Sequence, residues 1–258
     1  MEKVVYDSLG SSPHIIKCYA HDYTLPDDDD DDDDEPILNV FLEYAFGGSL
    51  SSLIKRSTIA TVSASVSVSV GMRESQARPH TRSILRGLEF IHGKGYVHCD
   101  LKPDNILLVH CDDDNPYGVD GFMAKIGDLG LAKKTKTGDS NGHNNNKSML
   151  RVRGTSMYLS PESVLENIQE QASDIWSLGC VVLQMLTGSL PWNERLQKEE
   201  LLLKIGTETP PLPQYLTPTA RDFLDKCFTR NPNERPSAQM LLSHPFAMYG
   251  VCSETPRP

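Results

Sequence analysis

The sequence has no long apolar run, no cysteine pair of metal-binding spacing and no apolar N-terminal segment. Its longest apolar stretch, Leu178–Leu186, is interrupted by Gly179 and Gln184 and is too short to span a bilayer. The N-terminal residues lack the apolar core of a signal peptide. Six cysteines are scattered without a C-x-x-C pair, which argues against a zinc site and a disulfide framework. We therefore expect a soluble protein of a reducing compartment, the cytosol or the nucleus, with no membrane partner.

The negative charge of the chain is concentrated in one segment. The formal charge is −10, but residues 27–35 hold nine consecutive acids, and the rest of the chain carries a charge of about −1. This balance gives no reason to expect a nucleic acid partner. The acidic run is predicted to be a solvated loop, and cation binding is the less favoured alternative.

The strand patterns lie in the first hundred residues. At 258 residues and 38% hydrophobic content, the chain can bury the core of one large domain or of two small lobes. Two apolar runs, 15–19 and 37–44, flank the acidic segment and predict neighbouring antiparallel strands. Before them, residues 2–9 have the apolar spacing of a helix fragment that stops at Gly10. Residues 63–70 alternate Ser with Val, apart from one Ala in a Val position, but their low complexity favours a surface loop over an exposed strand.

The second half is predicted to be mainly helical around a buried central helix. Ser173 has the side chain of an N-cap, and the residues from Asp174 to Leu186 are apolar on nearly every side until Gly188. Other helices are predicted at 80–92, after Gly47-Gly48, from Thr217-Pro218 onward and over 237–242.

Three short blocks carry most of the functional information: residues 98–105 (His-Cys-Asp-Leu-Lys-Pro-Asp-Asn), 128–130 (Asp-Leu-Gly) and 160–162 (Ser-Pro-Glu). In this order they resemble the signature motifs of eukaryotic protein kinases. Lys102, two residues after Asp100, indicates the Ser/Thr branch. Within that branch, segments 8–13, 96–100, 152–155 and 242–246 resemble the plant mitogen-activated protein kinase kinase kinases.

The resemblance covers nearly the whole chain and implies an α+β fold with a mainly helical C-lobe and an incomplete N-lobe sheet. It divides the chain into a residual N-lobe at 1–44, a hinge at 45–50, a C-lobe at 51–248 and a tail at 249–258. It implies transfer of the γ-phosphate of ATP, with Mg²⁺, to Ser or Thr of a protein substrate. A mitogen-activated protein kinase kinase is the candidate substrate.

The resemblance also assigns chemistry to four residues. Asp100 would orient the substrate hydroxyl and accept its proton. Asn105 and Asp128 would offer Mg²⁺ the hard oxygen ligands that it prefers. Lys102 would bring a positive charge to the transferring phosphate.

The remaining residues that the resemblance assigns bind nucleotide or support the fold. Leu42 would be the gatekeeper before the hinge, and the backbones of Glu43 and Ala45 would face adenine. Ser49 would lie near the ribose and Leu107 under the adenine ring. The structural assignments are His98 and Leu129 in the motifs, Thr155 at the end of the activation segment, Glu162 paired with Arg235, and Asp174 bracing the catalytic loop.

The chain departs from the family pattern at several points. Cys99 replaces an Arg that commonly pairs with an activation-segment phosphate, so we expect weaker dependence on phosphorylation, with Thr135, Thr137, Ser140 and Ser148 as candidate sites. Leu129 replaces a Phe, a tolerable apolar exchange. The 258 residues contain no Gly-rich loop and no Val-Ala-x-Lys strand.

The missing motifs lead to an expectation about the N-terminal half. Glu2 matches the helix Glu that normally pairs with the strand Lys, but without that Lys we expect a frayed terminal acid. We expect an N-terminally truncated kinase whose first exon or true start lies upstream, with weak nucleotide binding and an unpaired sheet edge. The alternative function is a catalytically impaired, kinase-like scaffold or competitor.

Overall fold

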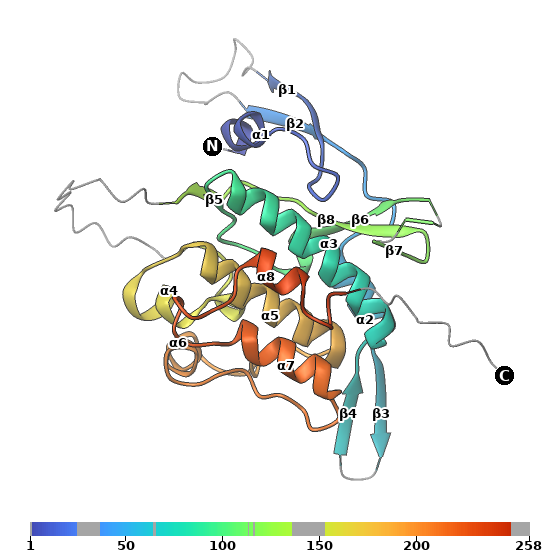
Figure 1. The fold of residues 1–258 in the computed structure, drawn as a ribbon, viewed down its shortest axis with the longest axis vertical. Helices are drawn as coiled ribbons and strands as arrows, with labels where there is room; N and C mark the ends of the chain where they lie inside the picture. Colours follow the sequence, from blue (N-terminus) through green and yellow to red (C-terminus); the bar gives the residue numbers. More distant parts are fainter. Residues whose placement is uncertain are drawn as a thin grey trace, which may run out of the picture.

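The computed structural model describes residues 2–24, 37–63, 66–112, 114–115, 117–135 and 153–248. A small region containing α1, β1 and β2 lies above a larger, mainly helical region, and the chain passes between them after β2 (Figure 1). The acidic segment 27–35 and the tail 249–258 lie outside the described residues. The mixture of helices with small antiparallel sheets agrees with the predicted α+β class.

The small region consists of one helix and one hairpin. Helix α1 (Glu2–Leu9) buries Val5, Tyr6 and Leu9, and Gly10 ends it with a positive φ of 75°. Strands β1 (Cys18–Thr24) and β2 (Ile37–Leu42) pair in antiparallel register. The predicted first strand, 15–19, is therefore wrong in its bounds, because Ile15 and Ile16 pair instead with Ile126 of β8.

The helical region is built around α5 (Gln171–Thr187), most of whose residues are buried. It packs against α3 (Glu74–Gly93) and α7 (Pro218–Cys227). The other helices are α2 (Leu50–Ser57), α4 (Pro161–Glu166), α6 (Lys198–Thr207) and α8 (Ala238–Leu242), with short 3-10 turns at Pro103–Asn105 and Ser156–Tyr158. Within the described ranges, no helix is both long enough and apolar enough to cross a membrane.

The helix starts confirm two predictions and correct a third. Thr217 and Ser237 are N-caps whose hydroxyls accept hydrogen bonds from the N–H groups of Ala220 and Met240. Ser173 is not the N-cap of α5, because the helix begins two residues earlier, after Glu170. Ser173 instead forms the third-position half of a capping box with Glu170.

Residues 59–63 and 66–70 form paired strands, where we favoured a loop over 63–70. Strand β3 (Ile59–Ser63) pairs antiparallel with β4 (Val66–Val70) between α2 and α3, and the hairpin projects from the helical region (Figure 1). The prediction of a loop was wrong because the period-two alternation, which suits a strand, outweighs the low complexity of the segment.

Two further small sheets precede the segments that contain the three signature blocks. Strands β6 (Ile106–His110), β7 (Gly118–Val119) and β8 (Phe122–Ile126) form one antiparallel sheet with β8 in the centre. Strand β5 (Tyr96–Val97) pairs with β9 (Lys133–Lys134) in the other. The segments that follow β5, β8 and β9 include all three signature blocks.

Candidate active site

Asp100 is the centre of a cluster of polar side chains after β5. Its Oδ2 lies 2.8 Å from Lys102 Nζ and accepts a 3.2 Å hydrogen bond from Asn105 Nδ2. Its Oδ1 accepts hydrogen bonds from the N–H and hydroxyl of Thr155, at 2.8 and 2.9 Å. Lys102 Nζ also donates to Thr155 Oγ1 at 2.9 Å. Residues 53 to 55 positions apart in the sequence thus meet at one carboxylate.

Asp174 holds the backbone of this loop from α5. Its carboxylate accepts hydrogen bonds from the N–H groups of His98 and Cys99, at 2.9 and 3.0 Å, and from His92 Nε2 at 2.8 Å. Burial would raise the pKa of the Asp174 carboxyl, but His92 and the His98 side chain and N–H lower it below its usual value. Asp174 is therefore a buried anion, and it supports Cys99 in a left-handed conformation with φ 69°.

Asp128 directly follows Gly127, whose backbone is hydrogen-bonded to the loop that contains Asp100. Gly127 N–H donates to Asn105 O at 2.8 Å, and Gly127 O accepts from His98 Nε2 at 3.0 Å. Asp128 itself is exposed, has a φ of 54° and accepts a 3.3 Å hydrogen bond from Gly130 N–H through Oδ1. Asn105 and Asp128 are thus attached to the same pair of hydrogen-bonded segments.

Glu2 lies beside this site, contrary to our expectation of a frayed terminal acid. It belongs to α1 and is half-buried. Burial and the nearby Asp128 carboxylate raise the pKa of the Glu2 carboxyl, while the Leu129 N–H opposes this rise. The packing of Val5 and Leu9 orders the helix from its first described residue, and a terminal position alone did not predict that.

The segment after β2 is fixed by a charged pair that the sequence analysis did not find. The Glu43 carboxylate accepts hydrogen bonds from Lys125 Nζ of β8, at 2.7 and 2.9 Å, and Glu43 N–H donates to Lys17 O at 2.8 Å. The Ala45 carbonyl accepts from Gly48 N–H in a turn. Leu42 is partly exposed. A pair 82 residues apart leaves no local signal in a single sequence.

Ser49 and Leu107 are neighbours in the structure. They form an isolated antiparallel bridge, in which Gly48 O accepts from Leu108 N–H at 2.9 Å. The Ser49 hydroxyl also accepts a 3.2 Å hydrogen bond from Ser52 N–H and caps α2. Two of the predicted nucleotide-binding residues, Ser49 and Leu107, therefore lie together where the segment 42–49 meets β6.

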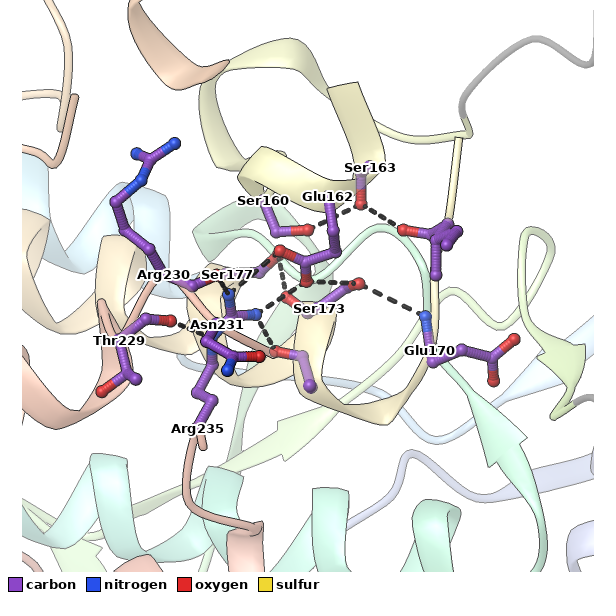
Figure 2. Close-up of polar contacts among 12 residues, drawn as sticks. Ser160, Glu162, Ser163, Glu170, Ser173, Ser177, Thr229, Arg230, Asn231 and Arg235 are labelled. Carbon is purple, nitrogen blue, oxygen red and sulfur yellow. Dashed lines mark hydrogen bonds and ion pairs between the residues drawn. The ribbon is translucent and has the colours of Figure 1, made fainter. Parts of the chain in front are cut away.

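The predicted pair of Glu162 and Arg235 is present as a fully buried ion pair. Arg235 Nη1 and Nη2 lie 2.8 and 3.0 Å from Glu162 Oε1 and Oε2, and Arg235 also donates to the carbonyls of Thr229 and Ala172. Ser173 Oγ donates to Glu162 Oε1 at 3.0 Å (Figure 2). Burial opposes the charge of Glu162, but Arg235 lowers the pKa of the Glu162 carboxyl below its usual value.

The larger of two cavities does not include Asp100 among its lining residues. A cavity of about 650 Å³ lies beside α1 and β1 and is bounded by Tyr6, Lys17 and Glu43, away from Asp100. Asp100 lines a much narrower one with Thr155. We place the candidate site at Asp100 because the charged groups converge there. Among the described residues, no group of three or more His, Cys, Asp or Glu gathers as a metal site.

Comparison with known families decides what this arrangement belongs to. The family model described as "Protein kinase domain" matches residues 1–247. The chain belongs to the protein kinase domain family. This kinase domain is 40% identical over 249 residues to mitogen-activated protein kinase kinase kinase 20 of Arabidopsis thaliana. The matched region covers 95% of this chain and 64% of that relative.

Two further relatives are similar over a smaller part of their length. Mitogen-activated protein kinase kinase kinase ANP1 of Arabidopsis thaliana is 36% identical over 82% of this chain and 28% of its own length. The Saccharomyces cerevisiae serine/threonine-protein kinase BCK1/SLK1/SSP31 is 38% identical over 82% of this chain and 13% of its own length. The kinase domain therefore spans less than two thirds of each of these relatives.

Proposed function

We propose that this kinase domain transfers the γ-phosphate of ATP to Ser or Thr of a protein substrate. The observation that carries the proposal is the contact of Asp100 with Lys102, Asn105 and Thr155 at hydrogen-bonding distance. A carboxylate fixed in this way can orient a substrate hydroxyl and accept its proton, and Lys102 can balance the charge of the phosphate.

The donor set at this site fits a nucleotide-bound Mg²⁺. Asn105 Nδ2 donates to Asp100 O at 2.9 Å and to Asp100 Oδ2 at 3.2 Å, so both amide hydrogens are used and the amide oxygen is left as a metal ligand. With Asp128 it offers two hard oxygen atoms, and water and phosphate oxygens would complete the shell. Bound there, Mg²⁺ would neutralise phosphate charge.

The remaining assignments belong to the same proposal. Adenine and ribose would bind at Leu42, Glu43, Ala45, Ser49 and Leu107. His98, Leu129 and Asp174 would support the catalytic loop, with Thr155, Glu162 and Arg235 supporting the segment that carries the substrate. The lobes would divide at the hinge 45–50.

We also propose a place in a mitogen-activated protein kinase cascade, as a kinase kinase kinase acting on a mitogen-activated protein kinase kinase. The names of the similar Arabidopsis proteins support this level of the cascade. The cytosol or the nucleus remains our proposed compartment. The free thiols of Cys18, Cys99, Cys180 and Cys227 agree with it.

The experiment is transfer of labelled γ-phosphate from ATP to a mitogen-activated protein kinase kinase, with and without Mg²⁺. We expect slow, Mg²⁺-dependent labelling, located on Ser and Thr and not on Tyr by mass spectrometry. Labelling of Tyr alone, or labelling that persists after removal of Mg²⁺, would contradict the proposal.

A second candidate is a scaffold that binds partners without phosphoryl transfer. It is favoured by the position of Glu2, whose carboxyl lies near Asp128, while these 258 residues contain no Val-Ala-x-Lys strand to pair with it. The same assay separates the candidates, because a scaffold gives no labelling but still binds its partner protein.

A further inference from the structure

The turn between α4 and α5 holds the segment that precedes Thr155. The Gln169 side chain is buried and makes two hydrogen bonds to the backbone of Arg153. Gln169 Oε1 accepts from Arg153 N–H at 3.1 Å, and Gln169 Nε2 donates to Arg153 O at 2.9 Å. The carboxamide thus satisfies the backbone of Arg153 as a neighbouring strand would.

The next residue of the same turn reaches the other end of that segment. Glu170 Oε1 lies 3.6 Å from Lys133 Nζ, and Lys133 is in β9, which pairs with β5 just before the catalytic loop. The Arg153 guanidinium also donates to Leu131 O at 3.2 Å. The two described ends of the segment between Asp128 and Glu162 therefore meet at Gln169 and Glu170.

The position of Arg153 decides the position of Thr155. Between them, Gly154 has a φ of 96°, and a Cβ there would overlap the Cys99 carbonyl oxygen, so the backbone passes directly over the catalytic loop. Thr155 then contacts Asp100 through both its N–H and its hydroxyl. Only Gly154 separates Arg153 from the residue that makes these two hydrogen bonds.

Charged groups of both signs surround the Cys99 thiol. Burial raises the pKa of Cys99 to about 12, and Lys133 and Arg153 oppose this rise while Asp174 and Glu170 add to it. Lys133, Arg153 and Glu170 therefore each lie close enough to Cys99 to act on its thiol. The carboxylate of Glu170, which belongs to the chain itself, is the anion that pairs with Lys133.

The turn between α4 and α5 is itself connected to the buried ion pair of Glu162 and Arg235. Glu170 N–H donates to Ser173 Oγ at 3.3 Å, and Ser173 Oγ donates to Glu162, the partner of Arg235 (Figure 2). A continuous series of hydrogen bonds thus connects Arg235 to the turn.

We propose that Gln169 and Glu170 are positioning residues that hold Thr155 against Asp100 by the chain's own carboxamide and carboxylate, so that this geometry needs no phosphate between Asp128 and Glu162. The proposal rests on the proposed kinase function for its catalytic consequence. The geometry itself can be tested without activity.

The experiment compares Gln169→Met, which is similar in size but makes neither hydrogen bond, with wild type and with the exposed control Gln197→Met. Phosphatase-treated proteins are followed by amide hydrogen exchange. In Gln169→Met we expect the amides of Arg153 and Thr155 to exchange about tenfold faster, with α5 unchanged. Glu170→Gln should speed exchange at the β5–β9 pairing instead.

Kinetics supply the readout that a purely structural role would not move. We expect Gln169→Met to lower kcat by about tenfold with KM for ATP unchanged, and phosphatase treatment to leave wild-type exchange unchanged. Unchanged exchange at Thr155 in Gln169→Met, or wild-type protection that requires phosphorylation, would overturn the proposal. Absence of turnover in wild type would count against the kinase function, while the exchange result would still decide the role of the turn.

Discussion

Arg235 and Glu162 form a two-point ion pair with no exposed edge: the side chains are 0% and 4% exposed. A pair buried to this extent is costly to break, because removal of one partner leaves an uncompensated charge without water.

We predict that Arg235→Met lowers the free energy of unfolding by about 3 to 5 kcal/mol. The exposed pair of Lys204 and Glu208 provides the control. Lys204→Met should change the free energy of unfolding by less than about 1 kcal/mol. Chemical denaturation measures both. A double variant, Arg235→Met with Glu162→Leu, should lose less than the sum of the single losses, and simple additivity would contradict the pairing.

Asp174→Asn should loosen the catalytic loop. The neutral amide keeps one acceptor oxygen for the two N–H groups of His98 and Cys99, so we expect a loss of about 3 kcal/mol in stability and a lower kcat. The exposed Asp225 gives a matched control in Asp225→Asn. Wild-type amide protection at Cys99 in the Asp174→Asn protein would show that this carboxylate does not hold the loop.

Stability should fall in mild acid because of two buried histidines. Burial lowers the pKa of His14 and of His80 to about 4. The unfolded chain takes up a proton below about pH 6.5 that the folded chain refuses, so this stability is complete above about pH 6.5 and is lost as the pH falls to about 4.

The His80→Phe variant isolates one of these contributions. Between pH 6.5 and 4, wild type should lose more stability than His80→Phe by about 3 kcal/mol, measured by denaturation at each pH. Equal losses in both proteins would mean that His80 accepts a proton in the folded state.

The sequence predicted those features that depend on short local patterns of residues. The helix starts near Thr217 and Ser237, the pair of Glu162 with Arg235 and the support from Asp174 each follow from residue types at defined places in the sequence. Ser173 was misplaced because its hydroxyl, typical of an N-cap, here occupies the third position of a capping box whose N-cap is Glu170.

The contacts that sequence did not predict are long-range. Lys125 with Glu43, and Gln169 with Arg153, join positions whose meeting depends on tertiary packing and follows no periodicity. The start of β1 was misplaced for the same reason, since Ile15 and Ile16 satisfy a strand pattern but pair with Ile126 in another sheet.

The most direct test of the account is phosphoryl transfer by Asp100→Asn compared with Asp104→Asn. Both carboxylates lie in the same loop, but Asp100 is buried against Lys102 and Thr155 whereas Asp104 is exposed. We predict that Mg²⁺-dependent transfer from labelled ATP falls at least about a hundredfold in Asp100→Asn and stays near wild type in Asp104→Asn. Equal transfer by the two variants would contradict the account.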